Sequence, residues 1–223
     1  MAALTPDCAA TVAPESLALC ARLATRPWSE EVYLAGSAAL ALYTGHRRVR
    51  DLDLMTGTNR LASPERRDLL SDLLEIEPQT RMETARDGYF SARLPGLALR
   101  LYYYPYPLVE PATEIAGLAV ASALDLGLMK LAAIISRGTK RDFVDLFLLC
   151  RRLPLEELLA RSEDKFGHVR DFPLQALKGL ADLSLAEDEP MPRLDHPLAW
   201  EEVRSWATAE VRRLGREALG MAP

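Results

Sequence analysis

The sequence predicts an α/β (α+β) fold, in which a mixed β-sheet core with flanking helices is followed by a C-terminal bundle of helices. Short apolar or alternating segments bounded by glycine and proline fill the first half of the chain, a pattern typical of strands. Longer segments with helical apolar periodicity fill the second half. A proline-rich boundary formed by Pro105, Pro107 and Pro111 separates the halves. We therefore expect one domain over residues 1–110 and a second over residues 111–223.

The composition narrows the class of protein. The chain has 223 residues, of which 49% are hydrophobic and 26% charged, so it can bury a substantial core. Its net charge of −5 argues against a protein that coats nucleic acids, because such proteins are usually basic. A nucleic-acid substrate would therefore have to bind at a local basic patch. Three scattered cysteines without metal-ligand spacing favour a reducing compartment. With no signal-peptide pattern at the N-terminus and no run of about 18 apolar residues, we expect a cytoplasmic protein.

The first elements form a strand–helix–strand unit behind an N-terminal helix. Residues 14–25 have amphipathic helical periodicity, and residues 32–35 form a short apolar strand. The strand breaks at Gly36-Ser37, and a helix follows over residues 38–43. Gly45 ends this helix because glycine tolerates the left-handed conformation found there. The alternating segment over residues 50–54 predicts a half-buried strand.

Two carboxylates share one face of that second strand. Alternation directs Asp51 and Asp53 to the face opposite Leu52 and Leu54. At a separation of about 6–7 Å they repel by roughly 2–3 kcal/mol for an effective dielectric of 20. A compensating positive group is therefore expected. It is either a Mg²⁺ ion, which takes carboxylate and phosphate oxygens together, or nearby basic side chains that form surface pairs: Arg47, Arg48 and Arg50.

The break between strand and helix has the chemistry of a phosphate-binding turn. Gly36 allows the backbone to approach a ligand closely. Ser37 begins a helix whose N-terminal amides attract phosphate. We expect these two residues to contact a phosphate group.

The remainder of the first half predicts a helix and an antiparallel meander. The helix begins at residue 63, and the strands cover residues 79–85, 89–94 and 97–104. Asp87-Gly88 and Pro95-Gly96 make the turns. On the last strand Arg100 and Tyr102 face away from the leucines. The aromatic run of Tyr102, Tyr103, Tyr104 and Tyr106 fits either stacking on a base or half-buried packing.

An apolar helix over residues 125–136 opens the second half. Lys130 is its only cation, and it either extends to water at the helix edge or meets an anion. After the turn at Arg137-Gly138 a second helix covers residues 141–153. Asp142 and Asp145 share a face of its first turn, where acids suit the helix dipole. An Arg141–Asp145 pair is a further structural explanation for Asp145.

The remaining chain predicts three helices, over residues 155–165, 172–183 and 200–219, which pack as a small bundle. The last helix carries aromatic and basic residues. They fit either a face for RNA or ordinary helix packing with solvated arginines: Trp200, Trp206, Arg204, Arg212 and Arg213.

These motifs, in this order, resemble the AbiEii/AbiGii-type toxin nucleotidyltransferases of bacteria, within the minimal nucleotidyltransferase superfamily. The matching residues span roughly 33–149, just over half of the chain. In the first half they are Gly36-Ser37, Gly45-His46-Arg47 and Asp51-Leu52-Asp53. In the second half they are Lys130 to Ala133, Arg137-Gly138 and the run Arg141-Asp142-Phe143-Val144-Asp145-Leu146. The resemblance implies a nucleotidyltransferase-type sheet core.

The resemblance also implies a reaction: Mg²⁺-dependent transfer of a nucleoside monophosphate from an NTP to an acceptor hydroxyl. By this reading Asp51 and Asp53 hold Mg²⁺, and Lys130 contacts the phosphates. Asp142 is the acid of the helical domain, which contributes Lys130 and Asp142 to the site. The implied nucleotide-binding residues are Gly36, Ser37, Arg47 and Lys130. Implied partners are the NTP, an acceptor such as the 3′ end of tRNA, and a cognate antitoxin protein.

The sequence departs from the family pattern at two positions. Nucleotidyltransferases often carry a third carboxylate on a strand beside the Asp-x-Asp strand, and here Arg100 occupies that strand. Val49 stands where the family usually has serine or threonine. Two other functions fit the same residues: a nucleotidyltransferase acting on a small antibiotic-like hydroxyl, and an NTP-binding module with weak catalysis.

Overall fold

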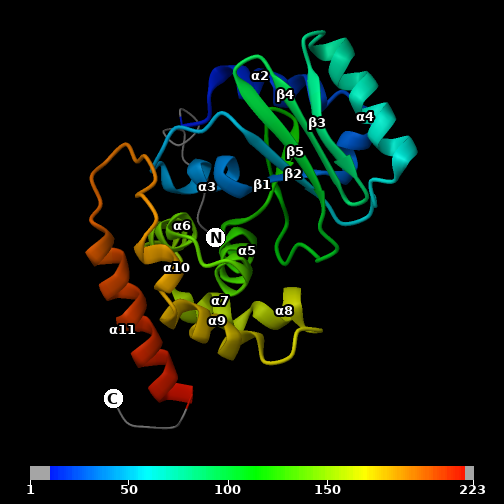
Figure 1. The fold of residues 1–223 in the computed structure, drawn as a ribbon. Coiled ribbons are helices and arrows are strands. Elements are labelled where there is room, and N and C mark those ends of the chain that lie inside the picture. The colour runs from blue at the N-terminus through cyan, green and yellow to red at the C-terminus, as the bar shows by residue number, and fades with distance from the viewer. Residues whose placement is uncertain (1–10, 219–223) are drawn as a thin grey trace. The chain divides into compact units, whose positions relative to one another are not determined.

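The computed structural model describes residues 11–218, which divide into two compact units (Figure 1). The α/β unit ends at Ser122 and the helical unit begins at Ala123. The mixed sheet followed by helices confirms the predicted fold class.

A seven-stranded mixed sheet organises the described part of the α/β unit, with the strand order β3-β4-β5-β2-β1-β7-β6. The central strand β2 is antiparallel to β1 and parallel to β5, and β1 is parallel to β7. The strands are β1 (Tyr33–Ala35), β2 (Leu52–Thr56), β3 (Arg81–Arg86), β4 (Tyr89–Leu94), β5 (Leu97–Tyr103), β6 (Thr113–Ile115) and β7 (Leu118–Val120).

Alternation along β2 separates the two faces of the sheet. Leu52, Leu54 and Thr56 are fully buried, whereas Asp53 and Met55 are half-buried on the other face. The predicted strand began at residue 50, but pairing begins only at Leu52. Asp51 therefore lies just before the strand. Its carboxylate still lies near that of Asp53, because both contact the guanidinium of Arg100.

Helices cover the sheet and connect its strands. In the α/β unit these are α2 (Pro14–Leu23), the 3-10 helix η1 (Pro27–Glu31), α3 (Gly36–Thr44) and α4 (Ser63–Ile76). The helix α3 contacts β1 and β2, and α4 lies beside β3 at the sheet edge (Figure 1). Gly45 ends α3 with a φ of 64°, which confirms the predicted left-handed helix end.

Two strands of the sheet were not predicted. The segments β6 and β7 have three residues each, and they follow the proline-rich stretch where the sequence placed the domain boundary. Because β7 pairs with β1, residues 111–122 complete the sheet, and the α/β unit extends to Ser122. The helical unit accordingly starts at Ala123 and not at residue 111.

The helical unit is a bundle in which α5 contacts α6, α7 and α9. Gly127 permits this packing, since a Cβ there would lie 2.6 Å from a side-chain methyl of Leu158. The described helices are α5 (Ala123–Ser136), α6 (Lys140–Cys150), α7 (Leu155–Ala160), α8 (Ser162–Phe166), α9 (Phe172–Ala181), α10 (Ser184–Glu187) and α11 (Trp200–Ala218).

A buried ion pair joins two helices of this bundle. The Lys165 ammonium lies 2.8 Å from Asp125 in the first turn of α5, and neither side chain has any exposed surface. Burial lowers the pKa of Lys165 and the contact with Asp125 opposes that shift. The pair ties α8 to α5, because either charge alone would be strongly disfavoured in this interior.

Two thiols lie in different units. Cys20 is buried in α2, and Cys150 is half-buried at the end of α6. Burial raises the pKa of each thiol to about 12. Cys8 lies outside the described residues. No helix within residues 11–218 has the length and apolar character needed to cross a membrane.

Candidate nucleotide-binding site

Gly36 brings the start of α3 against Asp53. Ala35 pairs with Asp53 across β1 and β2, and Gly36 follows with a φ of +59°. A Cβ at Gly36 would lie 2.5 Å from the Asp53 Oδ2 atom. The sequence predicted close backbone approach to a ligand at this glycine, and the structure shows close approach to the acidic strand itself. The N-cap residue of α3 is Ala35, whose methyl group cannot accept from the amides of the first turn.

Ser37 and Arg47 meet beside this turn. A terminal nitrogen of Arg47 donates to the Ser37 hydroxyl at 3.0 Å, and Arg47 is only 6% exposed. Arg47 thereby brings a buried positive charge next to the start of α3. His46 is also buried, and its Nδ1 lies 2.5 Å from the Thr44 hydroxyl, so it behaves as a hydrogen-bonded turn residue. Val49 is buried and pairs through its backbone with residues 11–13.

The two predicted metal-binding carboxylates share a guanidinium. Arg100 donates to Asp53 Oδ1 and to Asp51 Oδ2, each at 3.2 Å. Arg100 stands beside Asp53 because β2 and β5 pair in parallel with these two residues in register. The sequence placed Arg100 on this strand but did not predict that it would neutralise both carboxylates. Strand alternation indicates that Arg100 lies on a polar face of β5, but the register that brings it to Asp53 comes from the pairing of β2 with β5.

The donor set fits a Mg²⁺ ion that is shared with a nucleotide. Among the described residues no cluster of three or more His, Cys, Asp and Glu side chains could hold a metal. Asp51 and Asp53 remain partly exposed, at 40% and 21%. Magnesium in phosphate-transfer sites is held by one or two carboxylates together with phosphate oxygens and water. Two carboxylates beside a helix N-terminus meet that requirement.

Tyrosines extend the same sheet face toward β4. Tyr102 follows Arg100 by two residues and lies directly opposite Tyr89, with ring centroids 5.0 Å apart. Burial and the nearby Asp53 charge raise the pKa of Tyr102 to about 12. Tyr104 and Tyr106 form a separate tilted pair at 4.7 Å. The predicted aromatic run therefore divides: Tyr102 pairs with Tyr89 near Asp53, and Tyr104 pairs with Tyr106.

Within the helical unit Lys130 meets both acids of α6. Its ammonium lies 3.1 Å from Asp142 and 2.7 Å from Asp145, and both carboxylates are fully buried. Lys130 is thus an ion-paired residue with 11% of its side chain exposed. Asp145 anchors α6 to α5 through this contact.

Asp142 is the most heavily bonded carboxylate described in this unit. It accepts hydrogen bonds from Lys130, from two nitrogens of Arg137 at 2.8 and 2.9 Å, and from the Thr139 hydroxyl at 2.6 Å. Burial alone would raise the pKa of Asp142, but these donors lower it to about 2. Lys130, Arg137, Thr139, Asp142 and Asp145 therefore form one connected polar cluster over the turn between α5 and α6.

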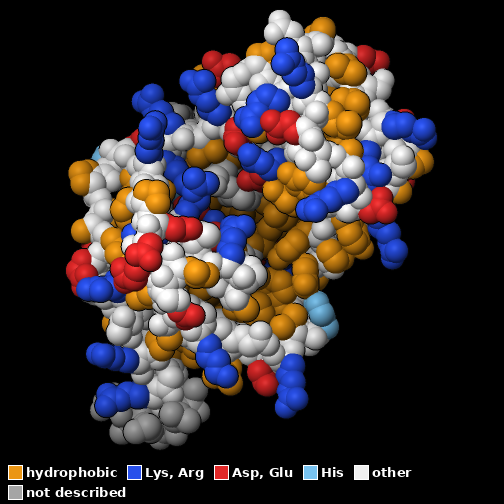
Figure 2. Space-filling model, in the orientation of Figure 1, with side chains coloured by type: hydrophobic (Ala, Val, Ile, Leu, Met, Phe, Trp, Pro, Cys, Tyr) orange, Lys and Arg blue, Asp and Glu red, His pale blue; other side chains and the backbone are white. Residues whose placement is uncertain are grey.

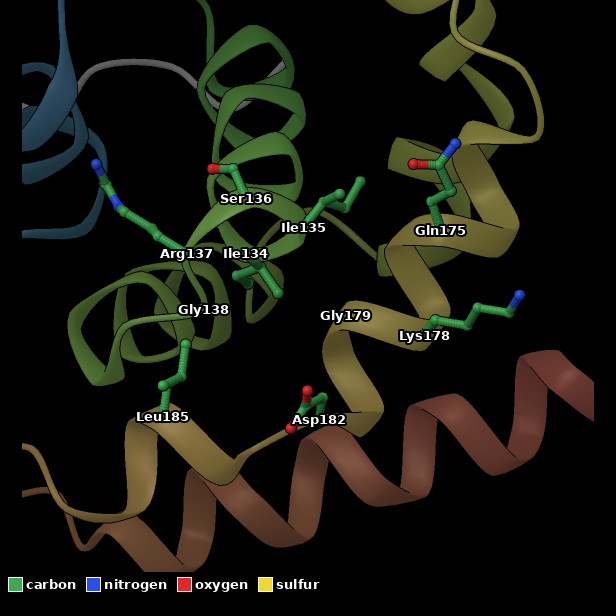
Figure 3. A pocket seen from close by; sticks show the side chains of 10 residues that line it. All are labelled: Ile134, Ile135, Ser136, Arg137, Gly138, Gln175, Lys178, Gly179, Asp182 and Leu185. Carbon is green, nitrogen blue, oxygen red and sulfur yellow. The ribbon is translucent and has the colours of Figure 1, made fainter.

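A pocket of about 350 Å³ lies close to this cluster (Figure 3). Ile134, Ile135 and Leu185 supply apolar walls, and Arg137 and Lys178 contribute cations. Figure 3 shows the charged ends of Arg137 and Lys178 pointing in opposite directions, so they do not converge on one anion.

The last helix does not present the proposed basic aromatic face. Trp200 and Trp206 pack edge-on against Phe143 and Phe147 of α6. Arg204 pairs with Glu187 and Glu201, and Arg213 pairs with Glu156 and Glu210. In the visible face of Figure 2 basic side chains are interspersed with acidic ones. These contacts favour helix packing.

No family model matches the chain. Its fold is similar to that of an H. pylori protein described as a candidate nucleotidyltransferase, with a TM-score of 0.54, 18% identity, and 96% of this chain and 97% of that chain covered. It is also similar to MenT4, a nucleotidyltransferase toxin from Mycobacterium tuberculosis H37Rv, with a TM-score of 0.52, 16% identity, and 92% and 84% covered. These likenesses show that the fold is that of nucleotidyltransferases.

A sequence relative gives the family. The uncharacterized protein aq_aa25 of Aquifex aeolicus (strain VF5) is 30% identical over 190 residues, which cover 82% of this chain and 87% of the relative. The chain therefore belongs to the same family as this Aquifex aeolicus protein, and it has the nucleotidyltransferase fold.

Proposed function

We propose that the protein is a nucleotidyltransferase that moves a nucleoside monophosphate from an NTP to an acceptor hydroxyl. The observation that carries the proposal is the contact between Asp53 and the start of α3 at Gly36. It sets paired carboxylates beside a helix N-terminus, which attracts phosphate through its amide dipoles.

Each residue of this site has a role in the proposed reaction. Asp51 and Asp53 would hold the Mg²⁺ of the nucleotide, which offsets the charge that develops on the triphosphate. Ser37, fixed by Arg47, donates to a phosphate oxygen near the first turn of α3. The acceptor oxygen bonds to the α-phosphorus and pyrophosphate leaves. The hydroxyl proton passes to whichever carboxylate of the pair lies within hydrogen-bond reach.

The resemblance carried by residues 33–149 supports a finer assignment to the AbiEii/AbiGii-type toxins. MenT4, a nucleotidyltransferase toxin, has a similar fold. On this basis we propose a toxin whose partner is an antitoxin protein and whose acceptor is an RNA such as a tRNA 3′ end. The assignment of Lys130 as the phosphate-contacting lysine and of Asp142 as the second acid stays a prediction that rests on the same resemblance.

Transfer of label from NTP to acceptor tests the proposed reaction. The purified full chain is incubated with Mg²⁺, each α-³²P-labelled NTP in turn, and either total tRNA or an aminoglycoside mixture. We expect label on RNA with at least one NTP, and its loss in Asp51→Asn and Asp53→Asn. Asp188→Asn, an exposed acid in the helical unit, serves as the matched control and should retain activity.

Other results select other functions. Label on the aminoglycosides and none on RNA would indicate a small-molecule nucleotidyltransferase. Binding of NTP without release of pyrophosphate would identify a binding module, for which the Arg100 contacts to both carboxylates provide a physical reason. Growth arrest on induction in a bacterial host, abolished by Asp53→Asn, tests the toxin assignment separately.

A further inference from the structure

Arg100 lies beside Asp53 in the register of β2 and β5, and it contacts both members of the acidic pair. We propose that Arg100 is a built-in cation that prevents Asp51 and Asp53 from retaining a free divalent ion, so that Mg²⁺ enters only together with the nucleotide. The inference deepens the proposed function and rests on it, since the incoming nucleotide is what brings the metal.

The hydrogen bonds of the acidic pair leave little room for a metal alone. Asp51 accepts from the Ala98 amide at 2.8 Å with one oxygen and from Arg100 with the other. Asp53 gives Oδ1 to Arg100, and its Oδ2 lies against the backbone of Gly36. Three of the four carboxylate oxygens thus accept an N–H donor. A metal that arrives without phosphate and takes the oxygens bonded to Arg100 displaces the guanidinium from them and leaves its charge without these partners.

A bound nucleotide offers Arg100 a new partner in place of the carboxylates. Phosphate oxygens match the planar donor fork of arginine, so Arg100 can exchange a carboxylate for a phosphate without losing a charged partner. The exchange is within reach because both contacts are 3.2 Å long and the Arg100 side chain is 30% exposed. Tight charge-assisted bonds are shorter, about 2.7–2.9 Å. Arg100 is therefore held by loose contacts that a better acceptor can replace.

The net charge of the site also disfavours a free divalent ion. Asp51, Asp53 and Arg100 together carry a net charge of −1, from two carboxylates and one guanidinium. A third carboxylate in place of Arg100 would give −3. Since attraction for a divalent ion scales with that charge, the native site binds a free metal far more weakly than a site with three acids would.

Metal binding by the full chain without nucleotide tests the inference. Mn²⁺ is titrated into the protein and the free ion is followed by electron paramagnetic resonance. We expect the wild type to show no saturation at millimolar Mn²⁺. Arg100→Gln should bind Mn²⁺ at least about tenfold more tightly, and Arg100→Asp about a hundredfold more tightly. Arg100→Lys, which keeps the charge, should behave as the wild type does.

Matched variants separate this effect from a general disturbance of the sheet. Arg93→Gln removes an exposed arginine of β4 that pairs with Glu83, and it should leave Mn²⁺ binding unchanged. Asp53→Asn added to Arg100→Asp should abolish the gained site. Circular dichroism confirms that each variant is folded, and Arg100→Gln retains a test should the acidic variant fail to fold.

Either of two outcomes overturns the inference: wild-type protein that binds Mn²⁺ as tightly as Arg100→Asp, or folded Arg100→Gln with unchanged affinity. The titration contains neither NTP nor acceptor, so its result is independent of the transfer assay. Label on RNA together with unchanged Mn²⁺ affinity in Arg100→Gln would reject the role of Arg100 and keep the proposed function. The reverse pattern would reject the transfer reaction and keep the exclusion of free metal.

Discussion

Gly36 determines where the Asp53 carboxylate lies. Its positive φ is accessible to glycine at low cost, and a methyl group there would overlap the carboxylate of Asp53. Gly36→Ala should therefore destabilise the protein by about 2–4 kcal/mol and reduce nucleotide transfer by about a hundredfold. Urea unfolding and the labelling assay measure the two effects.

Gly215 provides the control for this substitution. It lies within α11, and beyond the adjacent helix backbone a Cβ at that position would meet no atom of the described residues within 4 Å. Gly215→Ala should leave transfer unchanged and should stabilise the protein slightly, since alanine is the better helix former. Equal losses of activity in both variants would contradict the role given to Gly36.

Asp142 should make the free energy of unfolding depend on pH, and the sign of that dependence follows from the lowered pKa of its carboxyl group. The group titrates near 3.9 in an unfolded chain and at about 2 in the folded protein, so its stabilising contribution is complete above about pH 5. As the pH falls through 4 toward 2, most of that contribution of about 2.6 kcal/mol should disappear. Unfolding by urea at a series of pH values measures it.

Asp142→Asn removes the titration and leaves Lys130 and Arg137 without this charge, so stability at pH 7 should fall by about 3–5 kcal/mol. The difference in stability between wild type and Asp142→Asn should shrink as the pH drops. Asp188→Asn should change neither quantity, because that residue is exposed. A constant difference between pH 7 and pH 3 would contradict the assignment.

At this scale the sequence predicted the residues better than their partners. Alternation was enough to place Asp51 and Asp53 on one face, and the contact of both with Arg100 confirms that placement. The contact itself depends on the register of β5 against β2, a long-range pairing that local periodicity does not encode. The Lys130 contacts with α6 depend in the same way on how two helices pack.

Among the elements, those with strong local signals were predicted closely. The strand over residues 89–94 has the predicted bounds, and Gly88 and Gly96 take positive φ values at the expected turns. The helix predicted over residues 155–165 is divided into α7 and α8 at Arg161. The strands β6 and β7 are too short to show alternation, so only their pairing with β1 could identify them.

The ion pair between Lys165 and Asp125 should contribute to the packing of α8 against α5. Lys165→Met leaves the Asp125 charge buried without its ammonium partner, and it should cost about 3–5 kcal/mol of stability. The double variant Lys165→Met, Asp125→Leu should be more stable than the single variant, because it removes both charges. Thermal or urea unfolding of a double-mutant cycle measures the coupling, and strictly additive losses would argue against it.

For the whole molecule, the two compact units predict where the chain can be divided. A fragment of residues 1–122 retains β7 on β1, whereas a fragment of residues 1–110 leaves that edge of β1 uncovered. The longer fragment should be monomeric with native-like circular dichroism, and the shorter one should aggregate on size-exclusion chromatography. Equal behaviour of both fragments would show that β6 and β7 add little to the sheet.

The alkylation rates of Cys20 and Cys150 can report how often the structure around each thiol opens. Because burial raises the pKa of Cys20 and of Cys150 to about 12, an alkylating reagent at neutral pH should react slowly with each thiol until the surrounding structure opens. One thiol reports on the sheet-containing part of the chain and the other on the all-helical part. In a Cys8→Ser background, mass spectrometry can measure the rate at which the peptide containing each cysteine becomes alkylated. The cysteine that is alkylated faster identifies the unit that opens more often.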